Sequence, residues 1–129
     1  MTNENIKSFV RDILGCTCPE EVFQQIECAE NIRIQENLWI AHRIDVGGRL
    51  LIYVYNVERP TDIVEDMTKL ILHGQAAKKA DGYNRFRLVL ISDDKEGIAG
   101  HTAQVFDELE KDENIHLHVV GEGEFPGKA

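Results

Sequence analysis

The sequence has little cysteine and no long apolar run, and each shortage excludes a class of protein. Three cysteines in 129 residues are too few, and odd in number, for the disulfide framework of a small secreted domain. Residues 1–5 are polar and lack the apolar core of a secretory leader. The longest apolar run, residues 50–55, has the length of a strand, whereas a membrane span needs about 20 apolar residues. We therefore expect a cytoplasmic protein that makes no membrane contact.

Basic side chains are also scarce. The chain has 14 Lys and Arg against 23 Asp and Glu, a formal net charge of -9. Such a charge repels phosphate backbones, so the composition disfavours a nucleic-acid partner. Lys78, Lys79, Arg85 and Arg87 could form a local basic patch, but Asp81 interrupts them and they straddle a predicted turn. A solvated helix end is the simplest interpretation of these residues.

The chain does contain clear helix and strand periodicities. They predict a helix over residues 6–14 ended by Gly15, and a second short helix that starts at Cys18 and has Cys28 near its end. A meander of strands follows around residues 32–34, 38–44 and 50–57, with turns at 36–37 and 46–49. The remaining order is a helix over 61–81, a strand over 86–91, a helix over 98–109 and a strand over 115–119.

This order of elements predicts an α/β fold. A meander followed by β–α–β crossovers gives one mixed β-sheet covered by helices, because strands joined by crossover helices pair in parallel. The length fits a single domain over residues 1–120. Residues 121–129 are rich in glycine and charge, so we expect a flexible C-terminal tail.

The pair Cys16 and Cys18 is the sharpest chemical feature of the sequence. A helix N-terminus stabilises a thiolate, and a second thiol nearby can resolve an oxidised one or add a metal ligand. A zinc or iron site normally needs four ligands, so Cys28 is the candidate third and a second copy of the chain could supply the rest. Buried cap and packing roles are the alternative for all three cysteines.

His116 and His118 alternate in a predicted strand, so both rings point to the same face. Such a pair can bind a metal or titrate near neutral pH, and it forms a weaker, separate metal candidate. Two solvated or partly covered side chains on an edge strand are the alternative.

Two resemblances accompany these features. The stretch Leu14-Gly15-Cys16-Thr17-Cys18-Pro19-Glu20-Glu21-Val22-Phe23 resembles a motif of small uncharacterised prokaryotic proteins, which implies no activity. The order of hairpin, long helix, strand, helix and strand over residues 43–120 resembles the restriction-endonuclease-like fold. In that family an Asp precedes a strand carrying Glu/Gln-x-Lys, and these residues hold Mg²⁺. Here Asp45 matches the Asp, but Tyr53 and Tyr55 replace the other two, so the resemblance implies a degenerate site.

Two functional hypotheses follow. The first is a thiol-redox or metal-binding site, with zinc or iron, built on Cys16 and Cys18. The second is a non-catalytic binding or dimerisation module, with a second copy or another protein as its partner. The second rests on the incomplete catalytic set and on the aromatic residues Trp39, Tyr53 and Tyr55 of the predicted strands.

Overall fold

A computed structural model describes residues 3–15, 20–57, 62–111 and 113–125, and it confirms the α/β fold. The sheet has five strands: β1 (Ile26–Gln35), β2 (Leu38–Val46), β3 (Leu50–Asn56), β4 (Arg85–Ser92) and β5 (Ile115–Gly121). The helices are α1 (Asn3–Ser8), α2 (Ile63–Asp81) and α3 (Lys95–Glu108), with the short turns η1 (Phe9–Ile13), η2 (Glu20–Gln24) and η4 (Glu122–Glu124).

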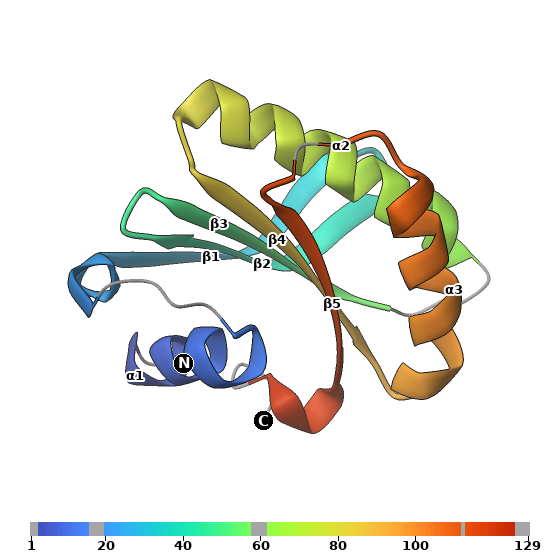
Figure 1. The fold of residues 1–129 in the computed structure, drawn as a ribbon, viewed down its shortest axis with the longest axis horizontal. Coiled ribbons are helices and arrows are strands. Elements are labelled where there is room, and N and C mark those ends of the chain that lie inside the picture. Colours follow the sequence, from blue (N-terminus) through green and yellow to red (C-terminus); the bar gives the residue numbers. More distant parts are fainter. Residues whose placement is uncertain (1–2, 16–19, 58–61, 112, 126–129) are drawn as a thin grey trace.

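The strands lie side by side in chain order, β1-β2-β3-β4-β5. β1, β2 and β3 pair antiparallel, and β3, β4 and β5 pair parallel, so the sheet is mixed as predicted. The crossover helices α2 and α3 lie on one face, and α1 lies on the other (Figure 1). Two right-handed crossovers that progress in the same direction place their helices on the same face. β1 and β5 are therefore the two edges of the sheet.

Turn residues set the register of the meander. Gly47 and Gly48 both have positive φ, 62° and 69°, a conformation that glycine adopts readily, and with Arg49 they connect Val46 to Leu50. Asn37, with φ of 66°, turns the chain between β1 and β2. Gly82 ends α2 in the left-handed conformation, and its N–H donates to the Lys78 carbonyl. These positions match the turns and the helix end expected from the sequence.

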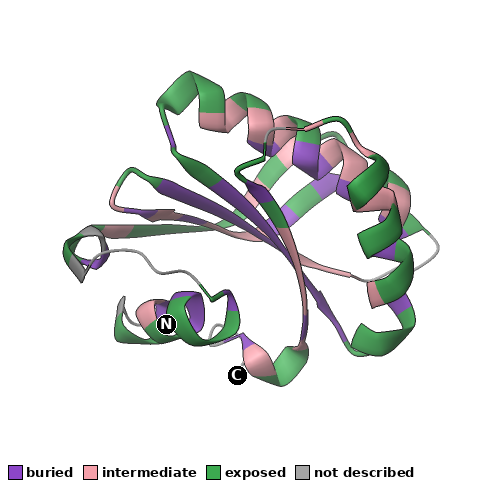
Figure 2. Ribbon diagram, in the orientation of Figure 1, coloured by how far each residue is buried: buried purple, intermediate pink, exposed green. Residues whose placement is uncertain are grey.

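Each face of the sheet has its own hydrophobic core. One core lies between the sheet and α1 with η1, and it contains Phe9, Val10, Ile52 and Val89. The other lies between the sheet and the helices α2 and α3, and it contains Met67, Leu70, Phe86 and Leu88, among others. β3 and β4 are buried by both cores, whereas most residues of the edge strand β1 are exposed (Figure 2).

The predicted second helix is wrong beyond its first turn. Glu20–Gln24 forms a single 3₁₀ turn, and β1 begins at Ile26. Cys28, expected near a helix end, lies in this strand opposite Ile44 of β2. The long ladder with β2 explains the difference, because cross-strand pairing overrides a weak helical periodicity.

The folded unit extends past residue 120. Gly121 completes β5, η4 follows, and Phe125 is only 1% exposed. The Phe125 ring contacts the Phe9 ring edge to face, with the centroids 5.1 Å apart. Residues 121–125 thus pack on the domain. The flexibility expected for 126–129 concerns residues outside the described part of the chain.

None of the helices in the described ranges combines the length and the apolar content needed to cross a membrane.

Candidate functional site

Most of the predicted thiol site lies outside the residues that the structure describes. Cys16 and Cys18 lie in the undescribed segment 16–19, so a thiol-redox or metal function there stays a prediction. Cys28 is exposed on β1, with its Sγ 3.7 Å from Nδ1 of His42. Desolvation and, to a lesser extent, the Glu30 carboxylate raise the pKa of the Cys28 thiol. A raised pKa disfavours the thiolate that redox chemistry or metal binding requires.

His116 and His118 lie on β5 as predicted, opposite Arg87 and Val89 of β4. His118 is the more enclosed of the two, and its Nε2 lies 2.7 Å from NH1 of Arg87. Burial, followed by the Arg87 charge, lowers the pKa of His118 to about 4. Burial and the charges of Arg87 and Arg85 also lower the pKa of His116. Two arginines beside the pair oppose a metal cation.

No group of three His, Cys, Asp or Glu side chains comes together as a metal site among the residues described. Zinc and iron therefore stay predictions tied to the undescribed cysteines.

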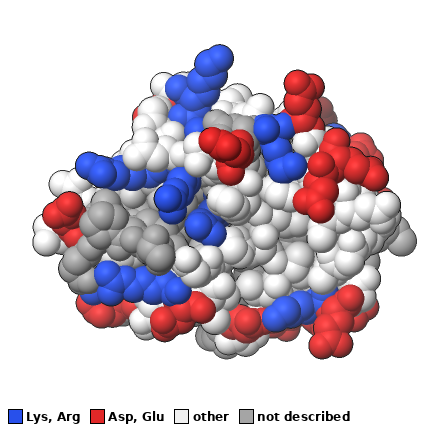
Figure 3. Space-filling model, viewed as in Figure 1, with Lys and Arg blue, Asp and Glu red and all other residues white. Residues whose placement is uncertain are grey.

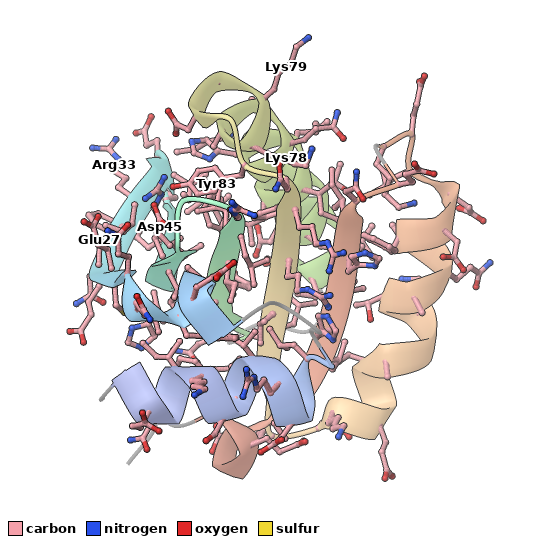
Figure 4. The ribbon with its side chains drawn as sticks, turned by 60° about the vertical axis from the view of Figure 1, so that its left-hand side comes forward. Glu27, Arg33, Asp45, Lys78, Lys79 and Tyr83 are labelled. Atoms are coloured by element: carbon pink, nitrogen blue, oxygen red, sulfur yellow. The ribbon has the colours of Figure 1, made fainter. Side chains whose placement is uncertain are left out.

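Asp45, the residue that matches the nuclease Asp, has a structural role at the hairpin. Its Oδ1 accepts from the Gly48 N–H at 2.7 Å, and its Oδ2 accepts from the Tyr83 hydroxyl at 2.7 Å. Arg43 donates to that hydroxyl at 3.4 Å. Figure 4 places Asp45 between Glu27 of the neighbouring strand and Tyr83. Asp45 thus fastens the β2–β3 hairpin to the start of β4, and both of its carboxylate oxygens are engaged.

The sheet splits at the end opposite this hairpin. β2 and β3 pair from Val46 opposite Leu50 as far as His42 opposite Val54, and no farther. β2 continues on its other side with β1 up to Leu38, and β3 continues with β4 up to Asn56. Leu38 and Ile40 therefore leave the β3 neighbourhood and pack in the core under α2. The split leaves an open groove at the carboxyl end of β3.

The groove has a volume of about 780 Å³. Its walls come from the β1–β2 hairpin, the end of β3 and the first turns of α2. The described residues that line it are Asn31, Glu36, Asn37, Leu38, Trp39, Ile40, Ala41, Tyr55, Asn56, Asp62, Glu65, Asp66 and Lys69. A volume of this size matches small-molecule sites, and crevices at the carboxyl ends of strands commonly hold ligands in open α/β sheets.

The lining is acidic and includes two aromatic residues, Trp39 and Tyr55. Four carboxylates, on Glu36, Asp62, Glu65 and Asp66, face a single ammonium, on Lys69. The Lys69 ammonium is held by Glu65 at 2.9 Å. The Trp39 side chain, on the β2 wall, belongs to a residue that is 53% exposed.

Two polar residues of the lining, Tyr55 and Asn56, differ in their hydrogen bonding. The Tyr55 hydroxyl donates to Oδ2 of Asp66 at 2.7 Å, which joins β3 to α2. Oδ1 of Asn56 is buried and has no hydrogen-bond partner in the described part of the chain. A buried carbonyl oxygen without a donor is destabilising, so this atom would gain from a ligand N–H.

Comparison with protein-family models, with curated proteins and with solved structures gives no match to this chain. The resemblances to the prokaryotic motif and to the restriction-endonuclease-like fold therefore stay predictions.

Sequence reasoning missed the groove. Trp39 was interpretable as one of an aromatic set in the sheet, and the acidic residues near position 62 as an ordinary helix start. The available indication was the alternation of β2, which places Trp39 on the side opposite Leu38 and Ile40. That Leu38 and Ile40 are buried at 4% and 1%, while Trp39 is not, agrees with this alternation.

Proposed function

We propose that the protein is a binding protein without catalytic activity of its own, and that its groove takes a small organic cation. The observation that carries this proposal is that four acidic residues and the exposed Trp39 line one groove of about 780 Å³. The ligand class has an apolar or flat body and amine or guanidinium donors.

Charge favours a cation over an anion or a neutral ligand. The lining residues contribute four negative charges and one positive charge, a formal total of -3. The whole chain, these residues included, carries a net charge of -9, which raises the local concentration of cations. An anion would meet repulsion from both sources.

Trp39, an exposed residue of the lining, offers a second interaction with the same class of ligand. A cation over the face of an indole gains about 0.5–1 kcal/mol at an exposed site and more when it is desolvated. An aliphatic or planar body can pack on the ring at the same time.

The residues that line the groove suit a protein that binds a ligand without transforming it. Its described residues include no His, Cys, Ser or Thr, so they offer no imidazole, thiol or aliphatic hydroxyl for nucleophilic catalysis. One oxygen of Asp66 is held by Tyr55, and Lys69 is paired with Glu65. These ties suit a preformed site that orients a ligand.

The test uses Trp39 as its own reporter, because it is the only tryptophan in the chain. Agmatine and spermidine are titrated while the tryptophan fluorescence is recorded, and calorimetry repeats the titration. We expect a saturable change in fluorescence. Asp66→Asn removes one groove carboxylate and should weaken binding roughly fivefold, the equivalent of about 1 kcal/mol for a partly exposed ion pair.

Glu4→Gln is the matched control, because it removes one exposed carboxylate from α1 on the other face of the sheet. This variant should bind as the wild type does. Equal weakening by both substitutions would mean that only net charge attracts the cation. The absence of saturable binding, or unchanged binding in Asp66→Asn, would contradict the proposal.

A further inference from the structure

Arg87 is a buried cation in the middle of the domain. It belongs to β4, is only 7% exposed, and shares a face of the strand with Val89 and Ile91 of the core under α1. Burial is the main cause that lowers the pKa of its guanidinium, and the Arg85 charge adds to it. Fully buried arginines are rare unless an anion compensates them.

The described part of the chain provides no such anion. NH1 of Arg87 donates to the Leu14 carbonyl at 3.0 Å and to Nε2 of His118 at 2.7 Å. Leu14 is the C-cap of η1, so its carbonyl supplies a partial negative charge only. The His118 ring, with its pKa of about 4, is a neutral acceptor at pH 7. No carboxylate of a described residue pairs with this guanidinium.

The Nε atom of Arg87 is buried and has no hydrogen-bond partner among the described residues. A guanidinium presents its N–H donors in a fixed fork, the geometry that matches an oxyanion, and the Nε donor of this fork is left unpaired among the described residues. A purely structural arginine would be expected to use this donor within the fold, since an unsatisfied buried donor is destabilising.

The surroundings add positive charge. Arg85 is exposed on the same strand. Its backbone N–H donates to the Arg49 carbonyl, so a third arginine lies next to it along the backbone. His116 is exposed opposite Arg87 on β5. Figure 3 shows Lys and Arg side chains gathered in the left half of the view, where β4 begins in Figure 1.

We infer that Arg87, assisted by Arg85, binds a compact oxyanion, the phosphate or carboxylate group of a small ligand. A bidentate contact through the guanidinium would satisfy Nε and neutralise the buried charge together. The net charge of -9 works against a long polyanion but acts much less on a single small group. This site is separate from the groove, which lies at the carboxyl end of β3.

The experiment follows the side-chain Nε–H resonance of Arg87 by NMR in isotope-labelled protein. Inorganic phosphate and acetate are the probes, and a short single-stranded oligonucleotide is a third arm. We expect phosphate or acetate to shift this resonance saturably. Arg87→Lys keeps the charge but loses the fork, and it should weaken binding about tenfold as judged from the amide resonances of β4 and β5.

Arg33→Lys is the control, because Arg33 is exposed on the edge strand β1, away from Arg87 on β4 (Figure 4). This variant should bind phosphate and acetate as the wild type does. If Arg87→Lys does not fold, Arg85→Gln takes its place and should weaken binding with the fold intact.

Three results would overturn the inference. One is an Arg87 resonance that moves only when the resonances near Arg33 move, which means unspecific charge screening. Another is equal binding by Arg87→Lys or, where that variant does not fold, by Arg85→Gln. The third is an oligonucleotide that binds far more tightly than phosphate, which would identify a nucleic-acid surface. None of these results bears on the cation groove.

Discussion

Replacement of Gly74 by alanine should destabilise the protein, although the same replacement stabilises most helices. Gly74 is a buried residue in the interior of α2. In an exposed helix, alanine is favoured over glycine by about 1 kcal/mol. At this position an added Cβ would overlap the ring of Phe86 on β4. The helix therefore lies on the sheet at a distance that only glycine permits.

The magnitude follows from how firmly Phe86 is held. The ring is 0% exposed and packs edge to face on Tyr53, with the centroids 4.9 Å apart. It cannot rotate into solvent, so α2 must shift or the core must deform. Overpacking of this kind costs about 1–3 kcal/mol, and the helical gain offsets part of it. We expect Gly74→Ala to lower the free energy of unfolding by up to about 2 kcal/mol.

Gly100→Ala is the matched control. Gly100 lies in α3, and an added Cβ would meet nothing within 4 Å. It should gain stability by about 1 kcal/mol, so the two substitutions should have opposite signs. Urea unfolding followed by circular dichroism and by Trp39 fluorescence measures both. Combining Gly74→Ala with Phe86→Leu should cost less than the sum of the single changes.

A Gly74→Ala protein at least as stable as the wild type would refute this reasoning. It would mean that α2 sits farther from the sheet than the structure has it.

Three further predictions test other parts of the molecule. The pKa of His118 should be about 4 by NMR titration, because burial and then Arg87 disfavour its charged form. The unfolded chain protonates this ring near 6.5, so stability should fall as the pH drops from about 6.5 to about 4 and be unaffected above that window. Cys28 should react more slowly with an alkylating agent at pH 7 than a thiol of ordinary pKa, because desolvation and the Glu30 charge raise its pKa. Phe125→Ala should lower the free energy of unfolding by about 3 kcal/mol or more in urea, because the ring is 1% exposed.

Local patterns were sufficient to predict most of the fold. The later strands and the two long helices follow from the spacing of apolar residues, and the turns follow from residues that accept positive φ, such as Gly47 and Gly82. These features depend on a few neighbouring residues. The predictions that were wrong or incomplete concern residues placed by long-range contacts. Ile26 belongs to a strand because it pairs with Val46, and Phe125 packs on the domain because its ring contacts Phe9.

The candidate sites depend on two features that alternation alone does not contain. In β2, Leu38 and Ile40 have the same parity as Ile44 and Val46, yet they pack in the core under α2 while the latter two pack in the core under α1. β2 twists and separates from β3 between Ile40 and Ile44. Twist accumulates along the whole strand, so a pattern of a few neighbouring residues does not predict it. The groove is the consequence of that departure, so its lining could not be assembled from sequence.

Arg87 is the opposite case, because its sequence position already held the relevant information. It interrupts an apolar segment, residues 86–91, that the sequence correctly predicts to be buried. A charged residue inside such a strand must be compensated by a partner, by solvent or by a ligand. The sequence cannot distinguish among these three, and the geometry narrows the choice: the described residues offer a carbonyl and a neutral imidazole, and Nε is left without either. The interpretation of Arg87 as part of a solvated helix end was therefore wrong, because Arg87 belongs to a strand that is buried on both faces of the sheet, and its charge finds no compensating anion among the described residues.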